Sequence, residues 1–449
     1  MAKASIIPLI CVEEGALVAA DLPAMHGAWA AANGFTGQRG RLLAVPAADG
    51  SLAAYLFGIG KQANRPALVT GLAGAALGPG RYRLEGAYGD PTLAAIGFRL
   101  GAYRYDRYRE GKPAPVLAGP GRADAAEVDR LVEAAALARD LINTPPNDLG
   151  PDAFEAEIRA FAATRKMKIK IIAGDELLRA NFPMIHAVGR ASIQAPRLVD
   201  LTWGNARDPK VTLVGKGVTF DTGGLDIKNP AGMLIMKKDM GGAANVLGLA
   251  HAIVSAKLRV RLRVLIPVVE NAIAGAAFRP GDILKSRKGI TVEIGNTDAE
   301  GRLILADALA LADEEHPDLL IDLATLTGAA RVALGPDLPP LYSNDDTLAR
   351  DLMDQGAAAD DPLWQMPLWA PYDAMMSSKI ADVNNAASGG FAGSVTAALF
   401  LRRFVSEATT WAHLDIYGWA PEARPGRSQG GTDQGIRAIY GVLKQRYPG

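Results

Sequence analysis

Along residues 1–117, short apolar runs alternate with breaks rich in glycine, proline and polar residues. The runs are RLLAVPA, LAAYLFGIG, RPALVTGL and LAAIGFRLGAY. Runs of this length, bounded by turn-forming residues, are typical of the short elements of a mixed domain. The pattern predicts a small N-terminal α/β domain over residues 1–117.

The pattern changes in residues 118–147. The stretch GKPAPVLAGPG, residues 111–121, is rich in proline and glycine and predicts a linker. Apolar residues then recur at helical spacing in an alanine-rich segment. This helix should end near Asn143, because Pro145 and Pro146 cannot continue it. We expect residues 118–147 to be a linker and a helix that bridges two domains.

From residue 148 to 449 the pattern switches repeatedly between strand and helix periods. The stretches with strand character are KMKIKIIAG, VTLVGKGVTF, RVRLRVLIPVVE, LLIDLATLTGA and TTWAHLDIYGWA. Helical stretches such as AANVLGLAHAIVSA and RLILADALALADEEH lie between them. Strands that alternate with helices predict a mixed, mostly parallel sheet covered by helices on both faces. The fold class is therefore α/β, with residues 148–449 as the larger domain.

The overall charge is balanced, with 48 Lys+Arg and 48 Asp+Glu among 449 residues. This balance argues against a protein whose whole surface grips nucleic acid or anionic lipid. Cys11 is the only cysteine, which excludes an intramolecular disulfide and a cysteine metal cluster. The N-terminal sequence lacks the long apolar segment of a signal peptide, and no window has the ~20 apolar residues of a membrane span. These features predict a cytoplasmic protein with no membrane partner.

Three glycine-rich segments place charged side chains at the ends of apolar strands. They are LVGKGVTFDTGGLDIK (213–228), MKKDMGGAAN (236–245) and GNTDAEGRL (295–303). In α/β sheets, ligand sites collect where strands run into loops, and glycines there allow close backbone approach. Taken singly, each charge has a structural explanation: Asp239 as a helix cap, for example, or Asp221 as a turn residue.

Taken together, the charges point to metal ions. Asp298, Glu300 and Arg302 would share one face if the strand before them continues, because strand side chains alternate. Two adjacent carboxylates at the end of a buried strand are costly unless cations compensate them. Asp221 and Asp239 bring the total to four carboxylates, which match the charge of two divalent ions. The charge pattern therefore predicts a two-metal site.

The residue types leave the metal and the reaction open. None of the five histidines lies in the three segments, whereas a catalytic zinc ion is usually bound by histidine. Carboxylates suit harder ions such as Mn²⁺ and Mg²⁺. A pair of ions activates a water molecule and polarises a carbonyl or a phosphoryl group. Peptide hydrolysis and phosphoester hydrolysis are therefore both open.

The segments together resemble a known family. VGKGVTFDTGG with the following DIK, MKKDMGGAA, NTDAEGRL and DLATLTGA are similar to motifs of the leucyl aminopeptidase (cytosol aminopeptidase) family of dimetal, M17-type exopeptidases. LARDLINTPPNDLGP and PLWQMPLW also resemble family segments. The resemblance runs from about residue 135 to the end of the sequence. The domain predicted over residues 1–117 shows no motif that we match to this family.

The resemblance implies a set of metal ligands. Asp221 and Glu300 would bridge two ions, while Lys216 and Asp239 would complete the more tightly held site. Asp298 would complete the looser site, partly through its backbone carbonyl. Lys216 has to be a neutral amine in this role, which a metal ion can enforce. The family also implies zinc, with Mn²⁺, Mg²⁺ or Co²⁺ exchanging at the looser site.

The resemblance assigns two catalytic residues. Lys228 would stay protonated and stabilise the oxyanion that forms from the scissile carbonyl. Arg302 would hold a bicarbonate ion that acts as the general base. The free α-amine of the substrate would bind one metal ion, so the implied partners are peptides with a free N-terminus. The implied assembly is a homohexamer of two stacked trimers.

The resemblance also implies a substrate pocket. In relatives its lining residues match Met236, Asn296, Ala299, Thr325 and Gly328. These residues suit an apolar, leucine-like first residue. Tyr417 departs from the pattern, because many relatives carry a small alanine there. Its ring would form either a bulkier pocket wall or an ordinary part of the core.

Two other functions stay open from the sequence. A dimetal phosphoesterase would use the same carboxylates for a different substrate. A scaffold or DNA-binding role, as some members of the family have, would need a local basic patch, since the balanced overall charge argues against general binding of nucleic acid.

Overall fold

The computed structural model describes residues 5–119 and 121–449. The first four residues and Pro120, which belong to the predicted N-terminal domain and linker, lie outside the described residues. The chain divides into two compact units. The boundary between Ala136 and Leu137 falls within helix α4 (Ala125–Asn143), which ends just before the two prolines, as predicted.

The first unit also includes Ala358–Asp360 and Ala420–Gly430, and the second unit holds the rest of the chain. The domain boundaries expected from the sequence, at residues 117 and 147, remain a prediction.

The first unit is built on a five-stranded sheet. Its strands are β1 (Ile6–Glu13), β2 (Leu42–Pro46), β3 (Leu52–Gly60), β4 (Arg81–Gly86) and β5 (Val116–Leu117). Their order is β2-β3-β1-β4-β5, with β1 parallel to β3 and β4, and β2 antiparallel to β3. The helices are η1 (Val18–Ala20), α1 (Ala24–Ala32), η2 (Gln62–Asn64), α2 (Gly71–Ala76) and α3 (Pro91–Gly101). Leu9, Cys11, Phe57 and Phe98 are buried in its core.

Strand β5 lies inside the stretch predicted to be a linker. The backbone N–H of Val116 donates to the carbonyl of Gly80 at 2.9 Å, and Leu117 pairs with Tyr82 of β4. The two apolar residues between the prolines therefore add a short parallel edge strand instead of remaining irregular.

The second unit contains a nine-stranded sheet. Its strands are β6 (Lys168–Ala173), β7 (Arg197–Trp203), β8 (Lys210–Gly215), β9 (Gly217–Asp221), β10 (Arg261–Asn271), β13 (Leu319–Ala324), β14 (Pro340–Ser343), β15 (Trp364–Gln365) and β17 (Thr410–Asp415). The order is β15-β14-β17-β13-β8-β10-β7-β6, and β9 also pairs with β10. Strands β17, β13, β8 and β10 are parallel to their neighbours in this series, whereas β7 runs antiparallel to both β6 and β10. The mixed, mostly parallel sheet is as predicted.

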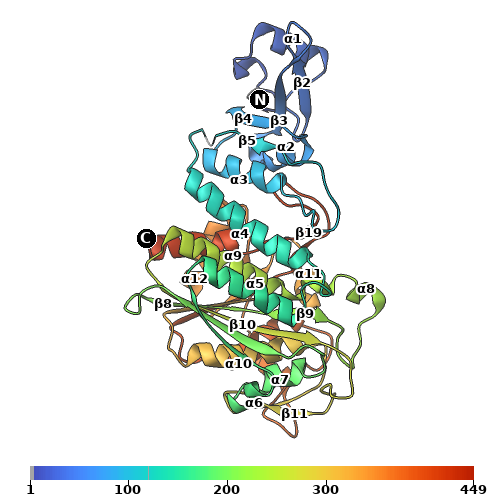
Figure 1. Cartoon of the computed structure of the whole chain (residues 1–449), viewed down its shortest axis with the longest axis vertical. Helices are drawn as coiled ribbons and strands as arrows, with labels where there is room; N and C mark the ends of the chain where they lie inside the picture. The colour runs from blue at the N-terminus through green and yellow to red at the C-terminus, as the bar shows by residue number, and fades with distance from the viewer. Residues whose placement is uncertain (1–4, 120) are drawn as a thin grey trace. The chain divides into compact units, whose positions relative to one another are not determined.

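Helices cover both faces of this sheet. Helices α5 (Pro151–Thr164) and α9 (Gly241–Ala256) contact β10 and β8 from one side. Helices α7 (Pro183–Gly189) and α10 (Glu300–Asp313) contact β10 from the other, and Figure 1 shows the two pairs above and below the strands. None of the helices in the described part of the chain is long and apolar enough to cross a membrane.

The remaining elements lie around this three-layer core. The helices are α6 (Glu176–Arg179), α8 (Pro230–Met233), η3 (Met236–Met240), α11 (Gly328–Leu334), α12 (Asp346–Ala358), η4 (Ala370–Met376), α13 (Gly393–Arg402) and α14 (Ile436–Arg446). The other strands are β11 (Ile283–Lys285), β12 (Thr291–Glu293) and β16 (Val383–Asn384), which form one small sheet, and β18 (Trp419–Ala420) and β19 (Gly430–Gly431).

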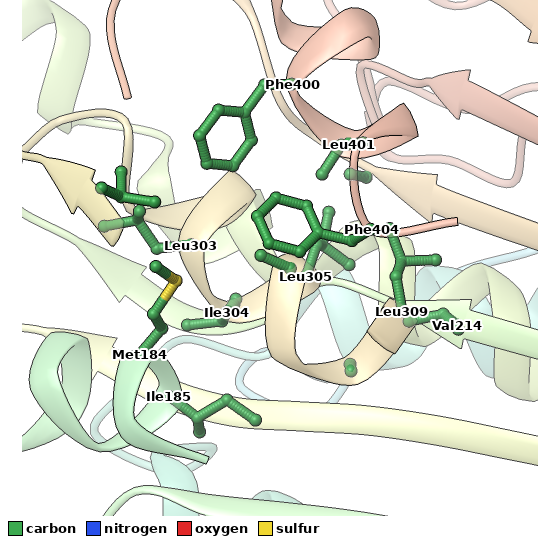
Figure 2. Packing of buried hydrophobic residues seen from close by; sticks show 14 of the residues in the cluster. Met184, Ile185, Val214, Leu303, Ile304, Leu305, Leu309, Phe400, Leu401 and Phe404 are labelled. Atoms are coloured by element: carbon green, nitrogen blue, oxygen red, sulfur yellow. The ribbon is translucent and has the colours of Figure 1, made fainter. Parts of the chain in front are cut away.

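Helix α10 is buried along nearly its whole length. Leu303 points toward Met184 of α7, and Leu309 lies near Val214 of β8, as Figure 2 shows. Phe404, just after α13, packs on the same cluster. A fully buried side chain of this size stabilises the fold by roughly 1.5–3 kcal/mol. The packing therefore fixes the N-terminal end of α10 with respect to the sheet.

The strand expected to continue through Asp298, Glu300 and Arg302 does not do so. Strand β12 ends at Glu293, and α10 begins at Glu300. The alternation of a strand therefore does not place these three charges on one face, and this prediction was wrong. Their proximity has another cause, described below.

Candidate active site

Four neighbouring parallel strands end at the same edge of the large sheet, and a buried polar residue lies at each end. Strand β17 ends with Asp415, and β10 ends with Asn271. Lys216 directly follows β8, and Thr325 directly follows β13. The carboxyl ends of parallel strands meet loops that can close over a ligand, so a site is expected at this edge.

Loops at this edge bring four carboxylates together. Asp221 is the last residue of β9, and Asp239 lies in η3. Glu300 is the first residue of α10, and Asp298 lies in the loop before it. Carboxylate oxygens of Asp221, Asp298 and Glu300 lie within 4.8 Å of one another. Asp298 and Glu300 are therefore brought together by a loop and the first turn of a helix, and not by the alternation of side chains along a strand.

Lys216 lies among these acids. Its Nζ is 2.8 Å from Asp239 Oδ2 and 2.8 Å from Glu300 Oε1. It also donates a hydrogen bond of 2.9 Å to the carbonyl of Thr325. Burial alone would lower the pKa of Lys216, but Asp239 and Glu300 outweigh burial and raise the pKa above its ordinary value. Gly301 leaves room for this side chain, because a Cβ there would lie 2.6 Å from Lys216 Cε.

Lys228 is the second cation of the site. Its Nζ lies 2.8 Å from Asp221 Oδ2 and also donates to Asp298 Oδ1. Burial opposes the charge, but Asp221 and Glu300 raise the pKa of Lys228 above its ordinary value. Burial and the neighbouring Asp221 raise the pKa of Asp298 to about 6. Lys228 is therefore a protonated donor beside the carboxylates.

Several buried carboxylate oxygens in this site have few donors or cations around them. Within residues 5–119 and 121–449, Glu300 Oε2 has no donor, and Glu300 Oε1 and Asp239 Oδ2 face only the ammonium of Lys216, at 2.8 Å each. Burial, followed by the charge of Asp221, raises the pKa of Glu300 above its ordinary value. Buried acceptors that need cations are what a divalent metal ion requires. The donor set, four carboxylates and one amine, fits two such ions.

The predicted site residues line two adjacent cavities. The first cavity, of about 330 Å³, contains all the predicted metal ligands together with Lys228. Met236, Thr325 and Gly328 also line it. The second cavity, of about 250 Å³, contains Asn296, Ala299 and Arg302. The two cavities share four lining residues: Asp298, Leu326, Thr327 and Gly328.

Arg302 therefore lies next to the metal-ligand cluster and not inside it. Its Nη1 donates to the carbonyl of Asn385 at 2.6 Å, while Nε is buried without an acceptor in the described part of the chain. Burial lowers the pKa of Arg302 to about 10, against the opposing effect of Glu300. A buried guanidinium with an unused donor suits a small anion in the second cavity.

Asn385 holds the loop before α10, a role that no sequence motif indicated. Its Oδ1 accepts hydrogen bonds from the backbone N–H of Gly295 at 2.8 Å and of Asn296 at 3.2 Å. Its Nδ2 donates to the carbonyl of Asn296 at 2.7 Å. The side chain is buried, so it fixes the segment that carries Asp298.

Asp415 supports the loop shared by the two cavities. Its Oδ1 accepts the backbone N–H of Leu326 at 3.0 Å and of Thr327 at 3.1 Å. Its Oδ2 accepts the hydroxyl of Thr327 at 2.5 Å. Sequence reasoning missed Asp415, although an acid at the end of the apolar run AHLD is the same signal that marked the other segments.

Tyr417, the residue that departs from the family pattern, lies half-buried between two cations of the first cavity. Lys238 Nζ is 4.8 Å from its ring centroid, and Arg331 Cζ is 4.5 Å from it. Cations at these distances are attracted to the face of an aromatic ring. Burial lowers the pKa of Lys238 to about 7. Neither cation was singled out from the sequence.

Comparison with known protein families agrees with this geometry. The model of the cytosol aminopeptidase family, catalytic domain, matches residues 136–440. The model of the M17 aminopeptidase N-terminal domain matches residues 8–118, where the sequence alone showed no family motif.

Individual relatives are similar over most of their length. A "Probable cytosol aminopeptidase" of Roseiflexus castenholzii is 44% identical over 376 residues, which cover 79% of this chain and 77% of that protein. The crystal structure of the cytosol aminopeptidase of Coxiella burnetii superimposes with a TM-score of 0.93 at 44% identity, covering 100% of this chain and 98% of that one.

A third match is the bottromycin maturation enzyme BotP in complex with Mn. It has a TM-score of 0.90 at 35% identity, over 99% of this chain and 100% of BotP. The family models, the relatives and the geometry lead to one assignment. The chain belongs to the cytosol aminopeptidase family and is a metal-dependent aminopeptidase.

Proposed function

We propose that this aminopeptidase hydrolyses the first peptide bond of its substrates at two divalent ions. Asp221 and Glu300 would bridge the ions, Lys216 and Asp239 would complete one site, and Asp298 would complete the other. The observation that carries this proposal is that the buried oxygens of Glu300 and Asp239 share a single ion-pair partner, Lys216, while oxygens of Asp221, Asp298 and Glu300 lie within 4.8 Å of one another. Ions bound there would activate water and polarise the scissile carbonyl.

Lys228 is the proposed oxyanion stabiliser. Its raised pKa keeps the ammonium charged, and it sits beside Asp221 and Asp298 in the first cavity. A fixed positive charge next to the reacting carbonyl stabilises the negative charge that develops on the oxygen. Its proton remains on Nζ throughout.

Arg302 is the proposed anchor of a bicarbonate ion that acts as general base. Its buried Nε has no acceptor among the described residues, and its charge lies in the second cavity, which shares Asp298 with the first. Arg302 would hold this ion by its charge and its free Nε, and the ion would supply a general base beside the metal site. Because the bicarbonate ion would act as the base, none of the five proposed metal ligands has to do so.

The two cavities suggest where the substrate lies. The first residue of the peptide would place its side chain in the first cavity, against Met236, Thr325 and Gly328. Asn296 and Ala299, which the resemblance placed in the same pocket, line the second cavity, so we propose that they contact the part of the peptide beyond the scissile bond instead. Because Met236 is apolar, we propose that an apolar, leucine-like first residue is accepted.

The remaining details are proposals by similarity to the family. Zn²⁺ and Mn²⁺ are the proposed ions, with Mg²⁺ as a substitute at the looser site; BotP, a structural neighbour, was solved with Mn. We propose a cytoplasmic location, in line with the names of the relatives, and a homohexameric assembly. Light scattering after size-exclusion chromatography measures the assembly directly.

The experiment that tests the function is release of leucine from leucyl-p-nitroanilide. The purified chain is stripped of metal and then reconstituted with Zn²⁺, Mn²⁺ or Mg²⁺. We expect hydrolysis that a chelator abolishes and that returns with two metal ions per chain, as measured by elemental analysis. Hydrolysis of p-nitrophenyl phosphate with no release of leucine would contradict the proposal.

A further inference from the structure

The first cavity has a cationic wall that the proposed reaction does not use. Lys238 is only 2% exposed, and it lines the cavity together with Arg331 of helix α11. Both side chains lie against the ring of Tyr417. Across residues 5–119 and 121–449, neither side chain has a hydrogen-bond acceptor or an ion-pair partner.

The acidic residues near Lys238 are already engaged. Asp239 accepts the hydroxyl of Thr325 at 2.9 Å and pairs with Lys216 at 2.8 Å. Asp415 accepts the loop donors described above and the hydroxyl of Ser394 at 3.2 Å. Lys216, like Arg331, adds a repulsive positive charge. Among the described residues, Asp239 and Asp415 attract the Lys238 ammonium through space, but neither forms an ion pair with Lys238 or with Arg331.

A buried ammonium without an ion-pair partner is unfavourable, since the more distant Asp239 and Asp415 do not outweigh its desolvation. The ring of Tyr417 offsets part of this loss but carries no negative charge. In a protein cavity, the anion that pairs with a cation of this kind commonly comes from the ligand. An acidic group of a substrate would be such an anion.

We infer that Lys238 and Arg331 bind the side-chain carboxylate of an acidic first residue, so that the enzyme releases N-terminal glutamate in preference to glutamine. This inference rests on the proposed function and names a substrate class for it. Met236, which lines the cavity, suits the methylene groups of glutamate as it suits leucine. Lys238 and Arg331 would bind the carboxylate of glutamate, a group that leucine lacks.

The chosen test compares three substrates that differ at one side chain. Glutamyl-, glutaminyl- and leucyl-p-nitroanilide are assayed with the Mn²⁺-loaded enzyme. Glutamine has the shape of glutamate without its charge, so the ratio of their kcat/KM values isolates the carboxylate. Charge-assisted hydrogen bonds are strong enough for a ratio of about tenfold or more in favour of glutamate.

The variants Lys238→Met and Arg331→Met remove each charge and keep a long side chain. We expect each to reduce the glutamate-to-glutamine ratio toward one, while turnover of leucyl-p-nitroanilide reports on the integrity of the site. Lys237→Met is the matched control. Its Nζ donates to the carbonyl of Asn143 at 2.7 Å and does not line the cavity, so its ratio should equal that of the wild type.

Metal content is measured for every variant, because Lys238 precedes the ligand Asp239. Arg331 lies on a separate helix, so its variant tests the inference even if Lys238→Met fails to fold. A wild-type ratio near or below one, with leucine still released, overturns the inference and leaves the proposed function intact. A ratio that persists in both variants overturns the assignment to these residues.

A second source of carboxylate is the C-terminus of a short peptide. If the cations bound that group, Lys238→Met and Arg331→Met would weaken hydrolysis of Leu-Gly and spare both glutamyl- and leucyl-p-nitroanilide, and this result too would overturn the inference. Failure of the metal-loaded enzyme on all three anilides would instead refute the proposed function on which the inference rests.

Discussion

The ammonium nitrogen of Lys216 and the carboxylate oxygen Oε1 of Glu300 lie 2.8 Å apart, and both side chains are almost completely buried. Removing one partner of such a pair leaves the other charge uncompensated, at a cost of roughly 3–5 kcal/mol. We expect Lys216→Met to lower the free energy of unfolding of the metal-free protein by this amount at pH 8, as measured by urea denaturation. Lys237→Met is the control, and equal stability of Lys216→Met and the wild type would contradict the arrangement.

Metal binding should depend on pH because the ligands must lose protons. Burial and Asp221 raise the pKa of Asp298 to about 6, and the pKa of Glu300 is raised as well. Below these pKa values a proton competes with the ion, so affinity rises with pH by about tenfold per unit for each proton displaced. Calorimetric titration with Mn²⁺ between pH 5 and 8 covers the pKa of Asp298 and measures this slope. An affinity that does not change with pH would refute the coupling.

Loss of the Lys228 ammonium should slow the chemical step. Removing one donor from an oxyanion site typically reduces kcat by about 100- to 1,000-fold. We expect Lys228→Ala to show this loss on leucyl-p-nitroanilide while two metal ions remain bound, because Lys228 is not a proposed ligand. Unchanged turnover would refute the role assigned to Lys228.

Asp239→Ala should lose metal instead. Asp239 Oδ2 faces Lys216 Nζ at 2.8 Å and has no other donor in the described chain, so the variant removes an available ligand atom. We expect occupancy to fall to about one ion per chain by elemental analysis, since one of two sites loses a ligand. Asp200→Ala is a suitable control, because Asp200 pairs with Arg263 at 2.7 Å outside both cavities. Full occupancy in Asp239→Ala would remove Asp239 from the ligand set.

Asp415→Asn tests whether the shared loop has to be held in place. The amide keeps the size of the carboxylate but loses the charge that accepts the donors of Leu326 and Thr327. We expect KM for leucyl-p-nitroanilide to rise about tenfold with metal content unchanged, because hydrogen bonds to a charged group contribute roughly 1.5–3 kcal/mol. Thr327→Val removes the hydroxyl alone and should show a smaller effect. Wild-type KM in Asp415→Asn would exclude this positioning role.

The sequence predicted the sheet, its covering helices and the chemistry at its edge, because each depends on local pattern. Apolar strands that end in glycine-rich, charged segments are visible without coordinates. Asp298, Glu300 and Arg302 lie near one another, but side-chain alternation along a strand is not the cause. The loop before α10 is held in place by Asn385, a residue far along the chain.

The contacts that depend on distant segments could not be predicted. Lys238 of η3 and Arg331 of α11 meet at the ring of Tyr417, although the three residues belong to separate segments of the chain, which no local pattern reveals. The family of the first unit could not be predicted from its sequence pattern either. Its short apolar runs predicted a small α/β domain, but only comparison with a family model identified it.

Gly301 of α10 lies directly against the side chain of Lys216, with no room for a methyl group between them. It occupies the second position of α10, where alanine would ordinarily favour the helix by about 1 kcal/mol. Here a methyl group would displace the Lys216 side chain that passes over it. Replacing helical glycines with alanine is a common route to a more heat-resistant protein. At this position the substitution would disturb Lys216, a proposed metal ligand, and would therefore reduce activity even if it made the protein more resistant to heat. An engineered version of the enzyme should keep the glycine.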